Sequence, residues 1–328
     1  MSSAVQPDRV LRELADLWVS LGKQGEEGGG VLRACAMTLV TVAGAEDDAQ
    51  DIGETLAGLM RHHPSRMIVI RLDPACKELA ARVFAQCWLP FGSRRQICCE
   101  QIEIQTPPDG LADAASAVLP LLAADLPVAV WLRHPSLLEH GGVDALFSLG
   151  GRLITDSARA ETPDRALRRL REALRTGLAA ADLAWTRVTR WRELVVQVFA
   201  NPAYLERAAW LRKIDIWQGG ADPHPSARYL AAWLGACLEA AGGAAETAFH
   251  AGPPESSISR VSLRGTGLHV ELEKVETAFV EVRVDGLSNR AVLQPSSDRS
   301  LLNEELSLAP PDRSFLAALD RVCATIGG

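Results

Sequence analysis

Hydrophobic and polar positions follow two different periods along the chain, and the first clear pattern is a strand, a helix and a strand. Residues 31–43, VLRACAMTLVTVA, are almost continuously apolar, which is typical of a strand buried on both faces. Residues 47–63 have helical spacing with acidic residues in the first turn, and residues 67–72 are apolar again. The three segments predict a β-α-β unit with parallel strands and a right-handed crossover.

The same alternation continues beyond this unit and predicts an α/β domain with a mostly parallel sheet and flanking helices. Two strand-like stretches, 81–89 and 95–104, are joined by the turn sequence PFGS, which predicts a hairpin. An amphipathic helix at 7–22 and a glycine-rich, flexible linker at 22–30 precede the domain. The other elements expected in it are a helix at 110–125, a strand at 126–132, a short helix near 142–149 and a strand at 152–157.

From about residue 162 the pattern predicts an α+β domain. The helix expected at 162–178 begins with Thr162, a good N-cap, followed by Pro163. Period-two alternation at 260–295 predicts a meander of antiparallel strands. The remaining expectations are helices at 181–199, 202–212, 225–241, 300–308 and 311–326, a strand at 213–218 and a loop at 242–257. The expected parts are therefore an N-terminal helix with its linker (1–30), an α/β domain (31–161) and an α+β domain (162–328).

Composition and charge exclude several classes of protein. The chain has 34 Lys and Arg against 41 Asp and Glu, a formal net charge of −7, which argues against general nucleic-acid binding. The N-terminus lacks the apolar core of a signal peptide, and no apolar run approaches the ~18 residues of a membrane span. We therefore expect a cytoplasmic protein without a membrane partner.

Seven cysteines are spread over the chain without C-x-x-C spacing, and most have apolar neighbours. This pattern is typical of free, buried thiols, so we expect no disulfide framework. Cys98 and Cys99 are adjacent in an expected strand, where neighbouring side chains point to opposite faces. One of these two thiols is expected to be buried, with the other able to face solvent.

The common catalytic signatures are absent, since the sequence has no Walker loop, G-x-S-x-G, H-E-x-x-H or EF-hand pattern. In open α/β sheets, ligands collect beyond the carboxyl ends of the strands. One such end carries Trp131 and His134, and His134 has the position of a general base without an evident nucleophile or metal partner. Another carries Asp156 and Ser157, which either bind a hydroxyl or phosphate group or cap the following turn.

The segment AWTRVTRWR (184–192) places two of the eight tryptophans and three arginines within nine residues. On a single helix, Trp185 and Trp191 fall on one apolar face. Arg187 and Arg192 flank that face. The simplest interpretation is core packing with arginine stems along its rim. The alternative is a binding surface, because Trp and Arg are enriched among interface anchors.

This region also carries a family resemblance. Residues 182–199, DLAWTRVTRWRELVVQVF, resemble the D-L-x-W-x-R-L-T-P-W-R-x-L-L-A-Q-x-F segment of the glucose-6-phosphate dehydrogenase assembly protein family (OpcA). Family members usually have Pro where this chain has Arg190, which implies that a new helix starts at Thr189. Other similar pieces occur in the same order over nearly the whole chain after about residue 30: HPSRMIVI, RRQICCEQIEI, VLPLLAADLPVAVWL, RLITDSAR, ARYLAAWLGACL and LLNEELSL.

The resemblance implies a non-catalytic protein of the pentose phosphate pathway that binds glucose-6-phosphate dehydrogenase and promotes its active oligomeric form. It implies no cofactor, metal or catalytic residue. The alternative is a sugar-phosphate- or nucleotide-binding sensor or enzyme that uses the cleft beyond the strand ends. The residues expected at the partner surface are Trp185, Arg187, Trp191 and Arg192, with Trp131, Asp156 and Ser157 as second choices by position.

Overall fold

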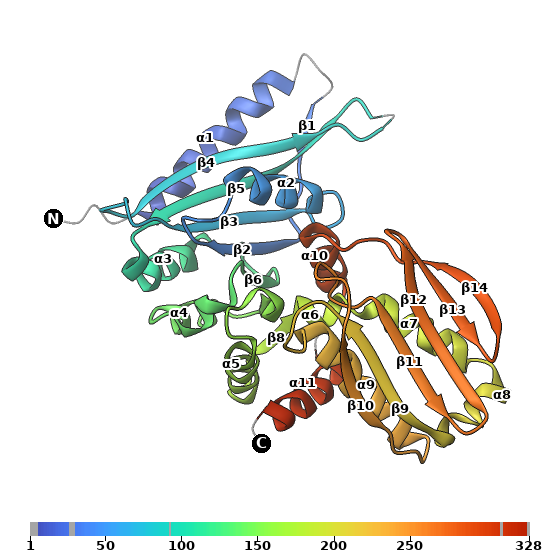
Figure 1. The fold of residues 1–328 in the computed structure, drawn as a ribbon. Helices are drawn as coiled ribbons and strands as arrows, with labels where there is room; N and C mark the ends of the chain where they lie inside the picture. The colour runs from blue at the N-terminus through green and yellow to red at the C-terminus, as the bar shows by residue number, and fades with distance from the viewer. Residues whose placement is uncertain (1–5, 26–29, 92, 309–310, 327–328) are drawn as a thin grey trace. The chain divides into compact units, whose positions relative to one another are not determined.

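A computed structural model describes residues 6–25, 30–91, 93–308 and 311–326 of the chain. The described residues form two compact units that interleave along the sequence (Figure 1). Unit 1 takes its residues from 1–160, 172–181 and 298–310, and unit 2 takes its residues from 161–171, 182–297 and 311–328. The interleaving arises because the segments 172–181 and 298–310 belong to unit 1, although the sequence neighbours of each on both sides belong to unit 2.

The larger sheet has eight strands and confirms the expected α/β class. Every strand pair from β1 to β7 along its order is parallel. Strand β4 (Ala80–Trp88) lies off this order, pairs antiparallel with β5 and confirms the predicted hairpin. The order is β1 (Val31–Arg33), β5 (Gln96–Thr106), β3 (Ser65–Leu72), β2 (Met37–Ala43), β6 (Val128–Leu132), β7 (Arg152–Thr155) and β8 (Ala179–Asp182).

Helices cover the apolar strands of unit 1. Helix α2 (Ala49–Leu59) connects β2 to β3 as expected and buries Ile52, Leu56 and Leu59 on one stripe. All seven residues of β2 are buried, which is typical of a central parallel strand. The other α-helices of this unit are α1 (Pro7–Gly25), which packs on β4, α3 (Leu111–Val118), α4 (Val143–Phe147) and α10 (Asp298–Ser307).

Two expectations for the first forty residues are wrong. The apolar run 31–43 forms two strands, because the chain leaves the sheet at 34–36 between β1 and β2. β1 pairs with the start of β5 and is largely exposed, whereas β2 lies between β3 and β6. Helix α1 continues to Gly25 through part of the predicted linker, and residues 26–29 of that linker lie outside the described residues.

The expectation that the chain has no disulfide framework is wrong for one pair of cysteines. Cys87 and Cys98 lie opposite each other in the β4–β5 hairpin and form a disulfide. Cys98 and Cys99 are both buried, so the expectation that one of them could face solvent is wrong. Cys98 is part of the disulfide, and the Cys99 thiol contacts the Ala34 carbonyl oxygen at 3.4 Å. Burial raises the pKa of the Cys99 thiol above its ordinary value. Disulfide pairing depends on the register of the hairpin, which spacing along the sequence does not reveal.

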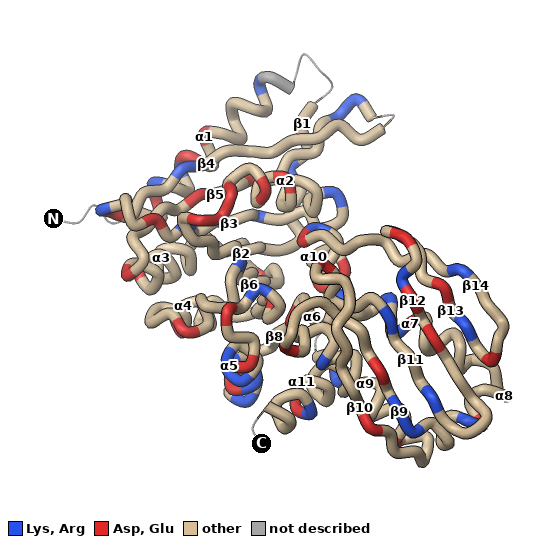
Figure 2. The backbone as a smooth tube through the Cα atoms, in the orientation of Figure 1, with Lys and Arg blue, Asp and Glu red and all other residues tan. Residues whose placement is uncertain are grey.

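The smaller sheet lies in unit 2 and has six strands. Strands β9, β11, β12, β13 and β14 pair in this order, and every pair is antiparallel, which confirms the predicted meander. Strand β10 pairs with the other edge of β9 and is parallel to it. Figure 2 shows acidic and basic residues following one another along these strands. The order is β10 (Glu246–Ala251), β9 (Leu211–Gln218), β11 (Arg260–Gly265), β12 (Leu268–Glu276), β13 (Phe279–Val284) and β14 (Leu287–Val292).

The remaining α-helices correct the predicted pattern after residue 162. Residues 181–199 do not form one helix, because β8 ends at Asp182 and two helices follow, the second of which starts at Thr189. The expected loop 242–257 contains β10, and the expected helix 202–212 ends early and leads into β9. These helices are α5 (Pro163–Arg175), α6 (Leu183–Thr186), α7 (Thr189–Phe199), α8 (Pro202–Leu205), α9 (Pro225–Ala240) and α11 (Arg313–Ile326). Among the described helices, none has the length and apolar composition needed to cross a membrane.

A buried carboxylate ties four elements of unit 1 together. Glu100 of β5 is 1% exposed and accepts hydrogen bonds from Trp18 Nε1 of α1 at 2.9 Å and from Arg33 Nη2 of β1 at 3.0 Å. Arg66 of β3, itself buried, forms a close ion pair with the same carboxylate. Burial alone would raise the pKa of Glu100, but the Trp18 hydrogen bond and the Arg66 charge outweigh it and hold the pKa below its ordinary value.

The variant Glu100→Gln removes the negative charge of this cluster and leaves the buried Arg66 guanidinium uncompensated. We expect the free energy of unfolding of unit 1 to fall by about 3–5 kcal/mol. Urea unfolding followed by tryptophan fluorescence measures the change. Glu103→Gln on the same strand is the matched control, because its partner Arg82 is largely exposed and the pair contributes ~1 kcal/mol or less. Equal losses in the two variants would contradict the prediction.

The lowered pKa of Glu100 also predicts a dependence of stability on pH. Its ionised carboxylate contributes fully above the unfolded-state pKa of about 4.3. That contribution is lost as the pH falls through the lower folded-state pKa. Urea midpoints measured from neutral pH down to about pH 3 should therefore fall more steeply for the wild-type chain than for Glu100→Gln. Parallel curves for the two proteins would rule out this assignment.

Candidate functional site

The loops that follow β2, β6 and β7 meet at the carboxyl edge of the larger sheet. The chain runs from β2 through α2 to β3 on one side, and from β6 to β7 on the other. The direction of winding therefore reverses between β2 and β6, and ligands of open α/β sheets bind at such a switch point. Asp47 lies in the loop after β2, and Arg133 and His134 directly follow β6.

Arg133 is buried at this edge and is held by three carboxylates. Its Nε donates to Asp47 Oδ1 at 3.0 Å, and its terminal nitrogens pair with Asp51 and Asp298. Its backbone N–H donates to the Val42 carbonyl oxygen at 3.0 Å, which continues the pairing of β6 with β2. The three carboxylates come from the β2–α2 loop, from α2 and from the first turn of α10. We call these four charged residues the Arg133 cluster.

The Arg133 cluster fastens the start of α10 to unit 1. Burial alone would lower the pKa of Arg133, but the charge of Asp298 and the hydrogen bonds to Asp51 and Asp47 outweigh it and hold the pKa above its ordinary value. Arg159 donates from Nη2 to both carboxylate oxygens of Asp298, at 2.7 Å and 2.9 Å. Asp298 therefore pairs with two guanidinium groups, and these ion pairs hold the first turn of α10 in place.

The other end of α10 is fastened by a second buried pair. Arg152 of β7 pairs with the carboxylate of Glu305, and the two residues are 8% and 2% exposed. Arg152 Nη1 also donates to the backbone carbonyls of Glu305 at 2.8 Å and Leu308 at 3.1 Å. These bonds satisfy carbonyl groups at the carboxyl end of a helix, where cations are favoured.

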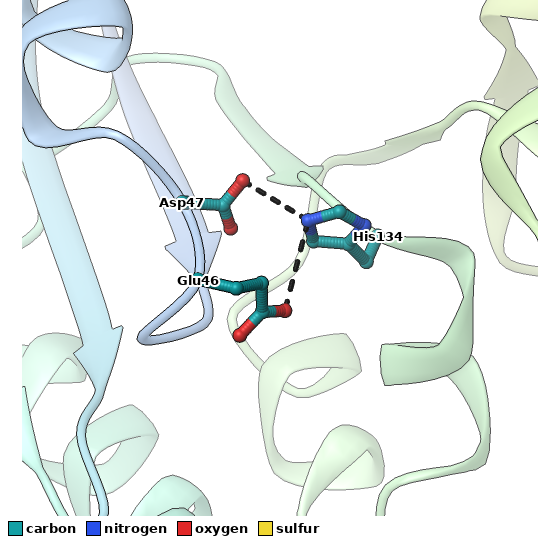
Figure 3. A group of neighbouring side chains, drawn as sticks. All are labelled: Glu46, Asp47 and His134. Carbon is teal, nitrogen blue, oxygen red and sulfur yellow. Dashed lines mark hydrogen bonds and ion pairs between the residues drawn. The ribbon is translucent and has the colours of Figure 1, made fainter.

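Glu46, Asp47 and His134 each place one possible metal-ligand atom within 4.8 Å of the others (Figure 3). His134 Nε2 is 3.0 Å from Asp47 Oδ1 and 3.7 Å from Glu46 Oε1. Asp47 Oδ1 also accepts the hydrogen bond from Arg133, so a cation would compete with a buried guanidinium for the same oxygen. The arrangement therefore fits an extension of the Arg133 cluster better than a metal site.

The loop after β2 is also unsuited to a phosphate group. It has the sequence Gly-Ala-Glu-Asp-Asp at 44–48, and Asp48 caps α2 by accepting the Gln50 N–H at 2.8 Å. Phosphate-binding loops at this place in an α/β fold offer glycine N–H groups and a free helix start. A phosphate here would instead meet the carboxylates of Glu46 and Asp47. The charge of the loop thus disfavours nucleotides and sugar phosphates at the switch point.

The structure places Trp131, Asp156 and Ser157 next to these loops but inside the protein. Each of the three is 1% exposed. The Arg133 Cζ lies 5.3 Å from the centroid of the Trp131 ring, within range of a cation–π contact. Asp156 accepts the Ala158 N–H at 3.2 Å and caps the turn that follows β7. The three residues brace the Arg133 cluster and the turn beside it.

The tryptophans of AWTRVTRWR lie in the core of unit 2. Trp185 is 2% exposed, donates its indole N–H to Asp312 at 2.8 Å, and meets Tyr229 edge-on with 5.9 Å between ring centroids. Tyr229 donates to Asp182 at 2.9 Å, and the other oxygen of that carboxylate caps α6. Trp191 is 4% exposed. A partner protein can therefore reach little of either ring without a change in the fold.

The arginines of the same segment lie at the rim of this core. Arg187 and Arg192 are half-buried, and Arg190 is exposed. The Arg192 Cζ lies 3.6 Å from the centroid of the Trp185 ring, and its Nη2 donates to Thr189 Oγ1 at 2.8 Å. The stacking and the hydrogen bond hold the cation in a defined position. This set of residues and the Trp131 set belong to different units.

Sequence reasoning placed Arg133 at the end of a strand but missed its role and its three carboxylate partners. The acidic residues before and within α2 have the pattern of ordinary helix-dipole partners, and Asp298 lies 165 positions from Arg133. One usable signal was present, because Arg133 directly follows a buried strand at the point where the sheet changes direction. A charge at such a position needs a partner, although the sequence does not reveal which one.

Two protein-family models match the chain in order. Residues 57–172 match the glucose-6-phosphate dehydrogenase subunit N-terminal domain, and residues 178–319 match the corresponding C-terminal domain. The chain belongs to the OpcA family of glucose-6-phosphate dehydrogenase assembly proteins. Membership confirms the family resemblance of the AWTRVTRWR region, which falls within the C-terminal match.

Curated OpcA proteins of two cyanobacteria are similar to this family member. The OxPP cycle protein OpcA of Nostoc punctiforme is 29% identical over 205 residues, which cover 60% of this chain and 42% of that protein. The OpcA protein of Synechocystis is 29% identical over 174 residues, which cover 51% of this chain and 34% of that protein. The matched part of this chain thus spans less than half the length of each relative.

The solved structures that resemble this chain at TM-scores below 0.5 include oxidoreductases, and their sequence identity to it is low. An NAD-binding oxidoreductase from Klebsiella pneumoniae has a TM-score of 0.49 at 10% identity, covering 89% of this chain and 95% of that one. A dehydrogenase from Chromobacterium violaceum has a TM-score of 0.46 at 14% identity, covering 89% and 94%. Values of this size have no bearing on the activity of this OpcA family member.

The variant Arg133→Met keeps most of the side-chain volume but leaves Asp47, Asp51 and Asp298 without their shared cation. We expect the free energy of unfolding of unit 1 to fall by about 3–5 kcal/mol, because the buried Asp47 carboxylate loses its guanidinium partner, whereas Asp51 is largely exposed and Asp298 keeps Arg159. Hydrogen exchange measured by mass spectrometry should become faster in the loop 44–48 and in α10.

Arg82→Met is the matched control for this substitution. Arg82 also pairs with a carboxylate in unit 1, but its side chain is 66% exposed. Its replacement should leave exchange in 44–48 and α10 unchanged. If Arg133→Met exchanges in these segments as slowly as the control, the Arg133 cluster does not hold α10.

Proposed function

We propose that this chain is a cytoplasmic, non-catalytic activator that binds glucose-6-phosphate dehydrogenase and promotes its active oligomeric form. The observation that carries the proposal is the ordered match of both family models, over 57–172 and 178–319. The Arg133 cluster supports a non-catalytic role, because it fills the switch point of the larger sheet with ion pairs. A substrate or nucleotide cofactor would need that place to be open.

Activation of this kind requires a difference in affinity. A binding protein shifts the equilibrium between two forms of its target only as far as it binds one form more tightly than the other. A factor of ten in affinity corresponds to about 1.4 kcal/mol, so a few well-placed contacts are enough. The activator therefore needs a rigid surface that matches the assembled dehydrogenase and fits the unassembled one poorly.

We propose the rim formed by Arg187 and Arg192 as part of that surface. Both guanidinium groups lie at the edge of a packed aromatic core, and Arg192 is held by Trp185 and Thr189. A guanidinium in a fixed position loses little conformational freedom on binding and suits carboxylate groups of a partner. In this proposal Trp185 and Trp191 act as the rigid support, since they are buried.

The alternative function, a sugar-phosphate or nucleotide sensor at the strand ends, has less support. It requires a cleft beyond β2 and β6 that accepts negative charge. The side chains found there are the carboxylates of Glu46, Asp47 and Asp51, and the guanidinium of Arg133 is already paired with two of them. Trp131, Asp156 and Ser157 are buried and do not line an open cleft.

The direct test is to mix the purified chain with its cognate glucose-6-phosphate dehydrogenase. We expect the two proteins to co-elute in size-exclusion chromatography, with a larger fraction of the dehydrogenase in its active oligomer. The double variant Arg187→Ala, Arg192→Ala should weaken binding at least tenfold, because charge pairs across an interface contribute several kcal/mol, on the order of 2–5.

Arg190→Ala is the control, because this exposed arginine of the same segment pairs only weakly with Glu193 across one helix turn. It should activate the dehydrogenase like the wild-type chain. Absence of co-elution and of any change in dehydrogenase activity would refute the activator proposal. Normal activation by the Arg187, Arg192 double variant would refute the proposed surface alone.

A further inference from the structure

Unit 1 contains a groove between α2 and α10 that the Arg133 cluster does not use. It encloses about 620 Å³, which is within the range of small-molecule sites, roughly 300–1,000 Å³. The ring of His63, which follows α2, lies with its Nε2 3.2 Å from the Asn303 carbonyl oxygen of α10 and ties the two sides together. The polar residues that line the groove are Glu54, Arg61, His62, Arg299, Ser300 and Asn303. We call it the α2–α10 groove.

The α2–α10 groove brings together two arginines that have no partner within the described residues. Neither Arg61 nor Arg299 makes a hydrogen bond or ion pair there, although both are exposed on facing helices or at their ends. Arg133 and Arg159, by contrast, are both engaged with carboxylates. Two unpaired guanidinium groups lining one cavity form an electrostatic site for an anion.

Helix electrostatics explain only part of this arrangement. Arg61 and His62 follow the carboxyl end of α2, where a cation is favoured whether or not a ligand binds. Arg299 is different, because it is the second residue of α10 and adds positive charge to the positive end of a helix. The acidic residue of that first turn, Asp298, is already engaged by Arg133 and Arg159. An anion in the groove would relieve the unfavourable charge of Arg299.

A glycine in α2 makes room for the Arg299 side chain. A Cβ atom at Gly58 would lie 2.2 Å from Arg299 Cδ, which is far closer than two carbon atoms can approach. The stem of Arg299 therefore lies directly against the backbone of α2. This contact directs the side chain across the groove that both residues line, instead of leaving it free in solvent.

The polar groups beside the two arginines favour hydroxyl groups on the same ligand. Asn303 Oδ1 is buried and has no hydrogen-bond partner among the described residues, so it offers an acceptor to a donor such as a hydroxyl. Ser300 and Glu54 supply further oxygens on the two sides of the groove. No Phe, Tyr or Trp belongs to its described lining, so a nucleobase would find no aromatic ring to stack on.

We propose that the α2–α10 groove binds a phosphate ester of a small polyhydroxylated molecule. Arg61 and Arg299 would hold the phosphate, with a further hydrogen bond from the His62 ring, and Asn303 and Glu54 would accept hydrogen bonds from the hydroxyl groups. This site is separate from the carboxylate-lined switch point. It also goes beyond the activator role, because it concerns a ligand of the isolated chain.

Isothermal titration calorimetry of the full chain, in buffer free of phosphate, tests the site with a hexose phosphate, glycerol phosphate and inorganic phosphate. We expect saturable one-site binding of the hexose phosphate that weakens as salt is added. Inorganic phosphate should bind at least tenfold more weakly, because it lacks the hydroxyl groups. Arg61→Ala and Arg299→Ala should each weaken hexose phosphate binding at least tenfold.

Arg313→Ala is the matched control, because Arg313 is an exposed arginine in the first turn of α11 that has no partner among the described residues and lies outside the groove. It should bind the hexose phosphate like the wild-type chain. Gly58→Ala keeps every charge but displaces Arg299, and it should weaken binding at least threefold. Circular dichroism of each variant confirms that it is folded.

Three results would overturn the proposal. The first is no saturable binding of any of the three phosphates, and the second is equal affinity for inorganic phosphate and the hexose phosphate. The third is a loss of affinity in Arg313→Ala as large as that in Arg299→Ala. Because no dehydrogenase is present, these outcomes leave the activator proposal untouched.

Discussion

The ion pairs of the buried Arg133 guanidinium are the interaction on which the organisation of unit 1 depends. One side chain joins the loop after β2, the helix α2 and the start of α10, which lie far apart in the sequence. A buried cation is tolerable only if its carboxylates stay in place, so each of the three segments constrains the other two. The same requirement fills the switch point of the sheet with charge. The polar α2–α10 groove, lined by residues farther along α2 and by α10, is open to a ligand.

The two units use buried charge in different ways. In unit 1, Glu100, Arg133 and Arg152 join elements to one another, and each is almost fully removed from solvent. Unit 2 also has buried carboxylates, but in its AWTRVTRWR region the rings of Trp185 and Tyr229 pack in the core and the Arg192 guanidinium lies at the rim. The first arrangement fixes the fold, and the charges engaged in it are not available to a partner. The second places cations where another protein can meet them, which is why the proposed partner surface belongs to unit 2.

How much the sequence predicts depends on whether a feature is local. The β-α-β unit and the meander from β11 to β14 were predictable, because the spacing of apolar residues along a segment shows which of its faces are buried. β8, with the sequence Ala-Ala-Ala-Asp, and β10 were not, because their strand state comes from neighbours in the sheet and not from propensity. The disulfide and the Arg133 cluster were missed for the same reason, since both need the register of distant segments. AWTRVTRWR identified the family, yet its burial was visible only in the structure.

The interleaving of the two units has a consequence for the order in which the chain can fold. As the polypeptide leaves the ribosome, all strands of both sheets are made before α10, which is encoded by residues 298–307. Until then Asp298 and Glu305 are missing, so Arg133 lacks one of its partners and Arg152 lacks its carboxylate. Domains made first commonly fold first. Here the domain begun first is completed almost last, and its ion pairs with α10 can form only after the second sheet has been synthesised.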